Sequence, residues 1–176
     1  IPGGTFTATE NNTAVLSNGT YGDNAKGEAT ITGGTFIVDE SAEGATLIWY
    51  GQGSGTGGTL EVSNAVFEGT FNEKVTDIYD VDITSCSSTS QVPSNLVADG
   101  MGEIGLDGIY HVGTTNSLLS QVANTEKVST IDVVVGSFEL NNVSAGVKVM
   151  NSGTGTVKVN GENVAPGNTV TVESGL

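Results

Sequence analysis

The sequence of 176 residues contains no arginine, and its five basic residues are all lysines. It has 20 aspartate and glutamate residues, so the formal net charge is -15 at pH 7. A chain this acidic repels phosphate backbones and anionic lipid headgroups. We therefore expect neither a nucleic-acid partner nor direct binding to a lipid surface. The acidic residues are scattered along the chain, which is typical of a solvated surface.

Cysteine and histidine each occur once, as Cys86 and His111. A single cysteine excludes an intramolecular disulfide bond. The two residues lie in separate segments, and no third residue has the spacing that a nucleophilic triad would need. They are also too few to form a histidine/cysteine zinc site. We predict that the protein is not an enzyme, with His111 facing solvent on a strand and Cys86 at a strand end.

Long apolar segments are also missing, since no run approaches the roughly 18 residues that span a bilayer. We therefore expect no membrane span. Proline occurs only three times, whereas glycine occurs 26 times, and threonine, valine, asparagine and serine are abundant. This composition favours short strands joined by tight turns.

Strand signals recur about every 8–12 residues along the chain. Asn160-Gly161 and Pro166-Gly167 are strong turn signals near its C-terminal end. We predict a single all-β domain over residues 1–176, with an irregular insertion at residues 85–101. The only helix that the pattern allows lies within residues 115–127.

A motif of a small, a β-branched and an aromatic residue recurs in the N-terminal part of the chain. Repeated units of this kind cannot bury their apolar faces alone and must stack on neighbours. We expect the aromatic side chain of Phe36 to be buried beneath a corner at Gly33-Gly34. The copies are Gly4-Thr5-Phe6, Gly19-Thr20-Tyr21, Gly34-Thr35-Phe36 and Gly69-Thr70-Phe71.

With these motifs, and with Leu60 and Val62 alternating with polar residues, residues 28–71 resemble a known fold. It is the right-handed parallel β-helix, a β-solenoid, of bacterial surface proteins, pectate-lyase-like folds and autotransporter passengers. Coils of that family often combine an alternating strand, a small or asparagine-containing corner and a Gly-x-Phe sequence. The strand spacing fits equally well a β-sandwich or jelly roll of a strand-donating filament subunit, so that alternative stays open.

Two groups of residues are candidates for binding. Trp49 and Tyr50 stand beside the glycine-rich residues 51–58, where aromatic rings would suit a glycan or a protein surface. Asp77, Asp80 and Asp82 form the densest group of carboxylates in a strand pattern. Asp80 and Asp82 would project from one strand face, roughly 7 Å apart, where they would either be solvated, share a Ca²⁺ ion or act as an acid/base pair.

Three Asn-x-Ser/Thr sequons, at Asn11, Asn18 and Asn142, are candidate glycosylation sites. No cofactor is expected apart from Ca²⁺.

Two functions remain open on this basis. The first is a non-enzymatic structural or adhesive protein, such as a surface stalk, filament subunit or virion component. Its partner would be further copies of itself, and its location the extracellular space, a cell surface or a virion surface.

The second possible function is that of a carbohydrate-binding or carbohydrate-cleaving β-helix domain that uses Trp49, Tyr50 and the three aspartates. The β-helix enzymes that cleave acidic polysaccharides typically need a cationic residue, often arginine, which this chain lacks. We therefore favour the structural function, with a glycan or a host-surface protein as a further partner.

Overall fold

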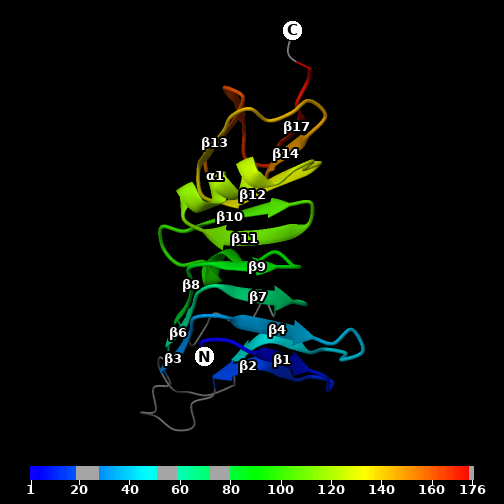
Figure 1. The fold of residues 1–176 in the computed structure, drawn as a ribbon, viewed down its shortest axis with the longest axis vertical. Coiled ribbons are helices and arrows are strands. Elements are labelled where there is room, and N and C mark those ends of the chain that lie inside the picture. The colour runs from blue at the N-terminus through cyan, green and yellow to red at the C-terminus, as the bar shows by residue number, and fades with distance from the viewer. Residues whose placement is uncertain (19–27, 51–58, 72–79, 175–176) are drawn as a thin grey trace. The chain divides into compact units, whose positions relative to one another are not determined.

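A computed structural model describes residues 1–18, 28–50, 59–71 and 80–174 of the chain. The chain forms two compact units, residues 1–99 and residues 100–176. Apart from one α-helix and one 3-10 turn, the regular elements of the described residues are β-strands (Figure 1). The predicted all-β class is therefore confirmed.

In the described residues of the first unit there are nine strands and the 3-10 turn. In chain order they are β1 (Thr5–Ala8), β2 (Ala14–Asn18), β3 (Glu28–Ile31), β4 (Gly34–Val38), β5 (Thr46–Tyr50), β6 (Thr59–Val62), β7 (Ala65–Glu68), β8 (Asp80–Ile83), β9 (Cys86–Ser88) and η1 (Ser94–Leu96).

Every strand pair recorded in this unit is parallel. The pairs form three stacks, β1-β4-β7-β9, β2-β5 and β3-β6-β8. The chain visits the three stacks in the same order twice, through β1, β2 and β3 and then through β4, β5 and β6. We call these passages the first tier (residues 5–31) and the second tier (residues 34–62). The third tier (residues 65–83) contains β7 and β8.

A ladder of phenylalanines forms the core of the β1-β4-β7 stack. Phe6, Phe36 and Phe67 occupy equivalent positions in the parallel register. Phe36 and Phe67 are both 0% exposed, whereas Phe6, at the edge of the stack, is 38% exposed. The predicted burial of Phe36 is thus confirmed.

The register corrects one part of the predicted repeat. The residues aligned with Gly34-Thr35-Phe36 are Ala65-Val66-Phe67, so Gly69-Thr70-Phe71 is not the third copy. Gly34 has a φ of 113°, a conformation that glycine adopts readily. In the third tier Asn64, with a φ of 54°, provides the positive φ one position earlier. The backbone of the third tier takes its positive φ at Asn64, so the residue aligned with Gly34, Ala65, does not have to be a glycine.

Side-chain hydroxyl groups add hydrogen bonds between tiers. The Ser63 hydroxyl donates to the carbonyl oxygen of Ile31 at 3.3 Å, and the Thr84 hydroxyl donates to that of Val62 at 3.1 Å. The backbone N–H groups of Ser63 and Thr84 donate to the same two carbonyls. Serine and threonine at these corners thus strengthen the contacts between stacked tiers.

The second unit has a mixed sheet, a small second sheet and one helix. Its main sheet has the order β11-β10-β12-β14-β17, and β13-β15-β16 form the second. The elements are β10 (Gly102–Leu106), β11 (Ile109–Gly113), α1 (Thr115–Asn124), β12 (Thr130–Val135), β13 (Phe138–Leu140), β14 (Lys148–Asn151), β15 (Val157–Val159), β16 (Glu162–Val164) and β17 (Thr169–Thr171).

The helix of this unit lies where the sequence allowed one. It ends at Asn124, three residues before the expected limit. Its N-cap is Thr114, whose hydroxyl oxygen accepts a hydrogen bond from the backbone N–H of Ser117 at 3.2 Å. Leu118 of the helix belongs to a core that includes Ile104, Val133 and nine other buried residues.

Both predicted turns are present. Asn160 and Gly161 have φ values of 48° and 88° and join β15 to β16, as expected of an Asn-Gly hairpin. At the second turn the N–H of Asn168 donates to the carbonyl oxygen of Ala165 at 3.0 Å, and Gly167 has a φ of 81°. A proline followed by a glycine at positive φ is the signature of a type II turn.

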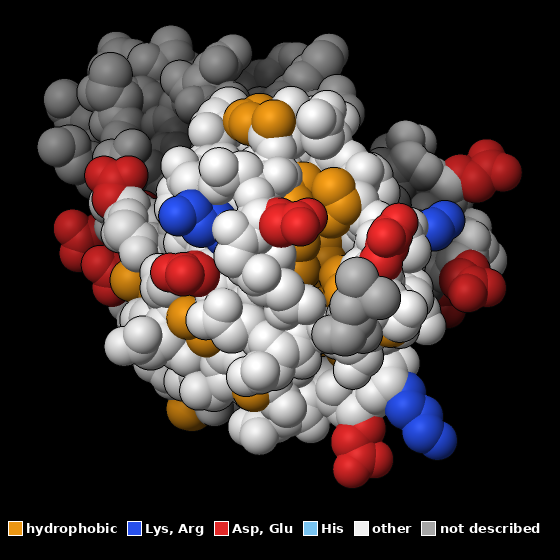
Figure 2. Space-filling view, turned by 90° about the horizontal axis from the view of Figure 1, so that it is seen from above, with side chains coloured by type: hydrophobic (Ala, Val, Ile, Leu, Met, Phe, Trp, Pro, Cys, Tyr) orange, Lys and Arg blue, Asp and Glu red, His pale blue; other side chains and the backbone are white. Residues whose placement is uncertain are grey.

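The range predicted as an irregular insertion, residues 85–101, contains β9 and η1. The side chains of Val92, Leu96 and Val97 within it are buried. In the part of the chain that the structure describes, no helix is long and apolar enough to cross a membrane. On the face seen in Figure 2, the acidic side chains are spread over the surface and do not gather in one large patch.

Candidate functional site

A groove of about 440 Å³ lies on the β3-β6-β8 stack of the first unit. Its lining combines carboxylates, hydroxyl groups and a small apolar floor. The lining residues are Thr30, Ile31, Glu61, Val62, Ser63, Asp82, Thr84, Ala98 and Asp99.

The parallel register determines which polar side chains meet there. Thr30 pairs with Glu61, and Glu61 pairs with Asp82. The next residue of each strand (Ile31, Val62 and Ile83) is at most 1% exposed, because it faces the core. Side chains alternate across a strand, so Thr30, Glu61 and Asp82 all point outward, and all three are exposed.

Glu61 and Asp82 are therefore carboxylates on neighbouring strands, which lie about 4.8 Å apart in a sheet. Like charges in directly opposed positions repel each other. Carboxylate oxygens also suit hard cations and the hydroxyl groups of glycans. Among the described residues that line the groove, none is basic. Among the described residues, no group of three or more His, Cys, Asp or Glu is placed to hold a metal ion.

Of the three aspartates named from the sequence, Asp82 lies in this groove. Asp80 is the first residue of β8, and only its backbone is described. Asp77 lies outside the described residues. The structure places Asp82 together with Glu61 and Asp99, which the sequence analysis did not name.

A signal for Glu61 was present in the sequence. Each strand of this stack has a central polar residue between two apolar ones, in Ala29-Thr30-Ile31, Leu60-Glu61-Val62 and Val81-Asp82-Ile83. Aligning these triplets would have paired Glu61 with Asp82. Because the triplets are unequally spaced along the chain, no fixed repeat length aligns them.

Trp49 and Tyr50 are the last residues of β5, where they pair with Ser17 and Asn18 of β2. Their side chains lie outside the described part of the structure. Because β5 belongs to the β2-β5 stack and β8 to the β3-β6-β8 stack, these aromatic residues and Asp82 lie in different sheets.

The single histidine and the single cysteine lie in different units. His111 lies in β11 and is half-buried rather than fully solvent-facing, and this burial lowers its pKa. Cys86 is the first residue of β9, at a strand end as predicted, and is buried.

A second polar cluster is found in the second unit. The buried Asp132 accepts hydrogen bonds from the Ser152 hydroxyl at 2.5 Å and from the Tyr110 hydroxyl at 3.5 Å. Burial raises the pKa of Tyr110, and the negative charge of Asp132 adds to this effect. The Ser152 hydroxyl is thus bonded to a carboxylate rather than to an imidazole. We interpret the cluster as a structural link between β11, β12 and residue 152.

Two of the three sequons have described side chains, and both asparagines are exposed. The Asn11 side-chain oxygen accepts a hydrogen bond from the N–H of Glu43 at 2.9 Å. Asn142 has a φ of 59°. The side chain of Asn18 lies outside the described residues.

Comparisons of this chain with protein-family models, with curated proteins and with solved structures found no match.

Proposed function

We propose that this chain is a non-enzymatic structural or adhesive protein that acts outside the cytoplasm by associating with further copies of itself. In this proposal the first unit is a right-handed parallel β-helix, and its location is the extracellular space, a cell surface or a virion surface. The observation that supports it best is the open edge of the first tier.

Within the described strands, β1, β2 and β3 each have a neighbour on one side only. In the parallel pair of β1 and β4, the carbonyl oxygens of Gly4 and Ala8 accept hydrogen bonds from β4 and the residue that follows it. Alternate residues of a strand direct their backbone groups to opposite sides. The N–H and C=O groups of Thr5 and Thr7 therefore face the open edge.

The composition of this edge favours pairing with another copy. Strands β1 and β2 contain no charged residue, although the chain has 20 acidic residues. Proteins that avoid pairing at strand edges usually place lysine, proline or inward-facing charges there. Phe6 also leaves a partly exposed ring at the end of the phenylalanine ladder, where a further apolar side chain would stack.

The experiment compares self-association of the parent chain with that of Thr7→Pro, using sedimentation velocity over a range of concentrations. Proline at residue 7 removes an N–H that faces the open edge, so pairing with β4 should survive. We expect the parent to associate and Thr7→Pro to remain monomeric with a similar melting temperature. A parent chain that stays monomeric at high concentration would contradict the proposal.

A matched variant, Thr171→Pro, identifies the partner surface. Strand β17 is the edge strand of the second unit. The residues that flank it, Asn168 and Val172, are hydrogen-bonded to Asn151 of β14 and to Val147 just before β14, so the N–H of Thr171 faces outward. If only Thr7→Pro abolishes association, first tiers pair with each other. If both variants abolish it, β17 of one copy pairs with β1 of the next. If neither does, strand-edge pairing is wrong.

A second candidate function is the binding or cleavage of glycans, and the groove above β3-β6-β8 is the observation that favours it. Its test is calorimetric titration of soluble polysaccharide fragments into the parent and into Glu61→Gln/Asp82→Asn, with product analysis for cleavage. If this candidate function is right, the parent binds the fragments and the double variant binds them more weakly. Equal heats in both proteins would rule out the groove as the binding site.

A further inference from the structure

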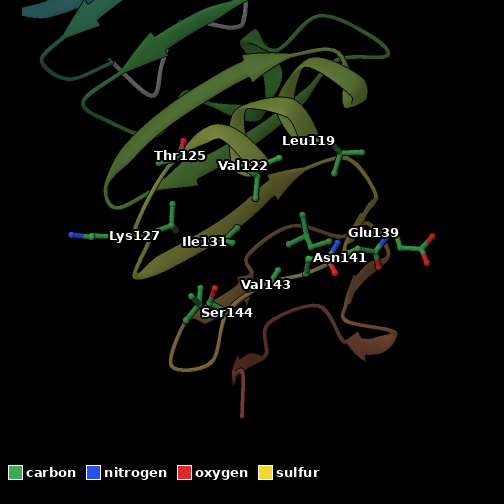
Figure 3. A pocket seen from close by; sticks show the side chains of 14 residues that line it. Leu119, Val122, Thr125, Lys127, Ile131, Glu139, Asn141, Val143 and Ser144 are labelled. Carbon is green, nitrogen blue, oxygen red and sulfur yellow. The ribbon is translucent and has the colours of Figure 1, made fainter. Parts of the chain in front are cut away.

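The second unit contains a cavity of about 410 Å³ between the C-terminal half of α1 and residues 139–147 (Figure 3). The buried side chains of Ile131, Leu140 and Val147 belong to the core of this unit and also line the cavity. This volume lies within the roughly 300–1,000 Å³ that is typical of small-molecule sites.

Its apolar walls are made of aliphatic side chains. Leu119, Val122, Val128 and Val143 line the cavity and are only partly buried against the core. None of the described residues that line the cavity is aromatic. The walls therefore leave aliphatic surface open to water, and they have no ring on which a sugar or a nucleobase would stack.

The charges at this site indicate that the occupant is uncharged. Among the lining residues that the structure describes, only Lys127 and Glu139 are charged, and both side chains extend away from the cavity in Figure 3. The hydroxyl of Thr125 donates to the carbonyl oxygen of Gln121 at 2.6 Å, so it is already engaged. An ionised ligand would thus lose its hydration without gaining a partner inside the cavity.

The wall opposite the helix is held in place from outside the cavity. The Asn160 side chain accepts a hydrogen bond from the N–H of Val143 at 3.0 Å and donates one to its carbonyl oxygen at 2.9 Å. These two bonds tie residue 143 to the β15–β16 hairpin. A wall fixed in this way reduces the entropy that a ligand must overcome on binding.

From these observations we infer that the cavity is a binding site for an uncharged molecule with a medium-length aliphatic chain. The inference does not depend on the proposed self-association, because it uses only residues 119–160 of the second unit. A terminal hydroxyl of such a molecule would lie at the rim, where Asn141, Asn142 and Ser144 provide polar groups.

The test is calorimetric titration of the full chain with 1-hexanol, 1-octanol and 1-decanol. Each added methylene group should raise the affinity about three- to fourfold until the cavity is full. Decanoate should bind more weakly than 1-decanol, because the chain is strongly negative and no cation points inward. A decanoate affinity equal to or above that of 1-decanol would overturn the assignment of an uncharged ligand.

Two variants of α1 locate the binding. Ala123 is exposed and lines the cavity, so Ala123→Trp should fill it from the rim and reduce the affinity for 1-decanol at least tenfold. Ser120 is exposed on the same helix without lining the cavity, so Ser120→Trp should bind like the parent. Melting curves without ligand check that both variants fold.

Three outcomes would overturn the inference: no saturable binding of any alcohol, equal binding by Ala123→Trp and the parent, or equal loss of binding in both variants. If the alcohols do not bind and Ala123→Trp alone disrupts self-association, the cavity is a contact between copies instead.

Discussion

The rings of Phe6 and Phe36 lie nearly parallel, with centroids 5.3 Å apart and planes inclined by 10°, although 30 positions separate the two residues. Phe36 also contacts Phe67, at 5.6 Å between centroids. One ring in the middle of the ladder thus links three strands that are distant in sequence.

Phe36→Ala should lower the free energy of unfolding by about 3–5 kcal/mol, because the ring is fully buried and its removal leaves a cavity in the core. Phe6→Ala should cost less than about 2 kcal/mol, since its ring is partly exposed. Val66→Ala, an exposed position on the same stack, is the control. Urea denaturation measures all three, and a loss below about 1 kcal/mol for Phe36→Ala would contradict the burial of its ring.

Removing one of the paired carboxylates should stabilise the first unit. Glu61→Gln relieves the repulsion from Asp82 and should raise the free energy of unfolding by roughly 0.2–1 kcal/mol, with a larger gain at low salt. The control is Glu139→Gln, an exposed glutamate in the second unit. If both variants gain equally, the effect comes from the net charge and not from the pair.

Calcium should stabilise the parent chain more than it stabilises Asp82→Asn. Two carboxylates provide only part of the six to eight oxygens that Ca²⁺ requires, so we expect a weak site with a Kd of about 10⁻⁴–10⁻³ M. Melting temperatures with calcium and with a chelator measure the difference. Identical shifts in parent and variant would mean that calcium acts through general screening.

Asn160→Asp should loosen the contact between the β15–β16 hairpin and residue 143. Aspartate tolerates the positive φ and keeps the acceptor, but it cannot donate to the Val143 carbonyl. We expect a loss of about 0.5–1.5 kcal/mol in the free energy of unfolding. Asn163→Asp, an exposed position in β16, adds the same charge and should change little. Faster amide exchange at Val143 in Asn160→Asp alone would support the link, and unchanged exchange would refute it.

His111 should make the protein less stable as the pH falls below about 6.5. Burial lowers its folded pKa, so in this range the unfolded state binds more protons than the folded state. The free energy of unfolding should therefore decrease from pH 7.5 to pH 5.5, and His111→Gln should show less of this decrease. As the chain has one histidine, a proton NMR titration gives its pKa directly. A pKa at or above 6.5 in the folded protein would show the expectation to be wrong.

Features that depend on neighbouring residues were predictable from the sequence. The Asn160-Gly161 and Pro166-Gly167 turns formed as expected, because left-handed φ values and a fixed proline φ are local properties of these residues. The helix lies where the pattern allowed one, and only the structure shows that it forms and where it ends.

Pairing between distant strands was decided by the tertiary structure. Backbone hydrogen bonds are equally available in any register, so the register depends on burying the side chains of all strands together. That requirement aligned Phe67 rather than Phe71 with Phe36, and it placed Glu61 beside Asp82. The sequence by itself determined the strands, the turns and the apolar positions. The acidic groove and the aliphatic cavity exist only because stacking brings residues from several separate segments to one place.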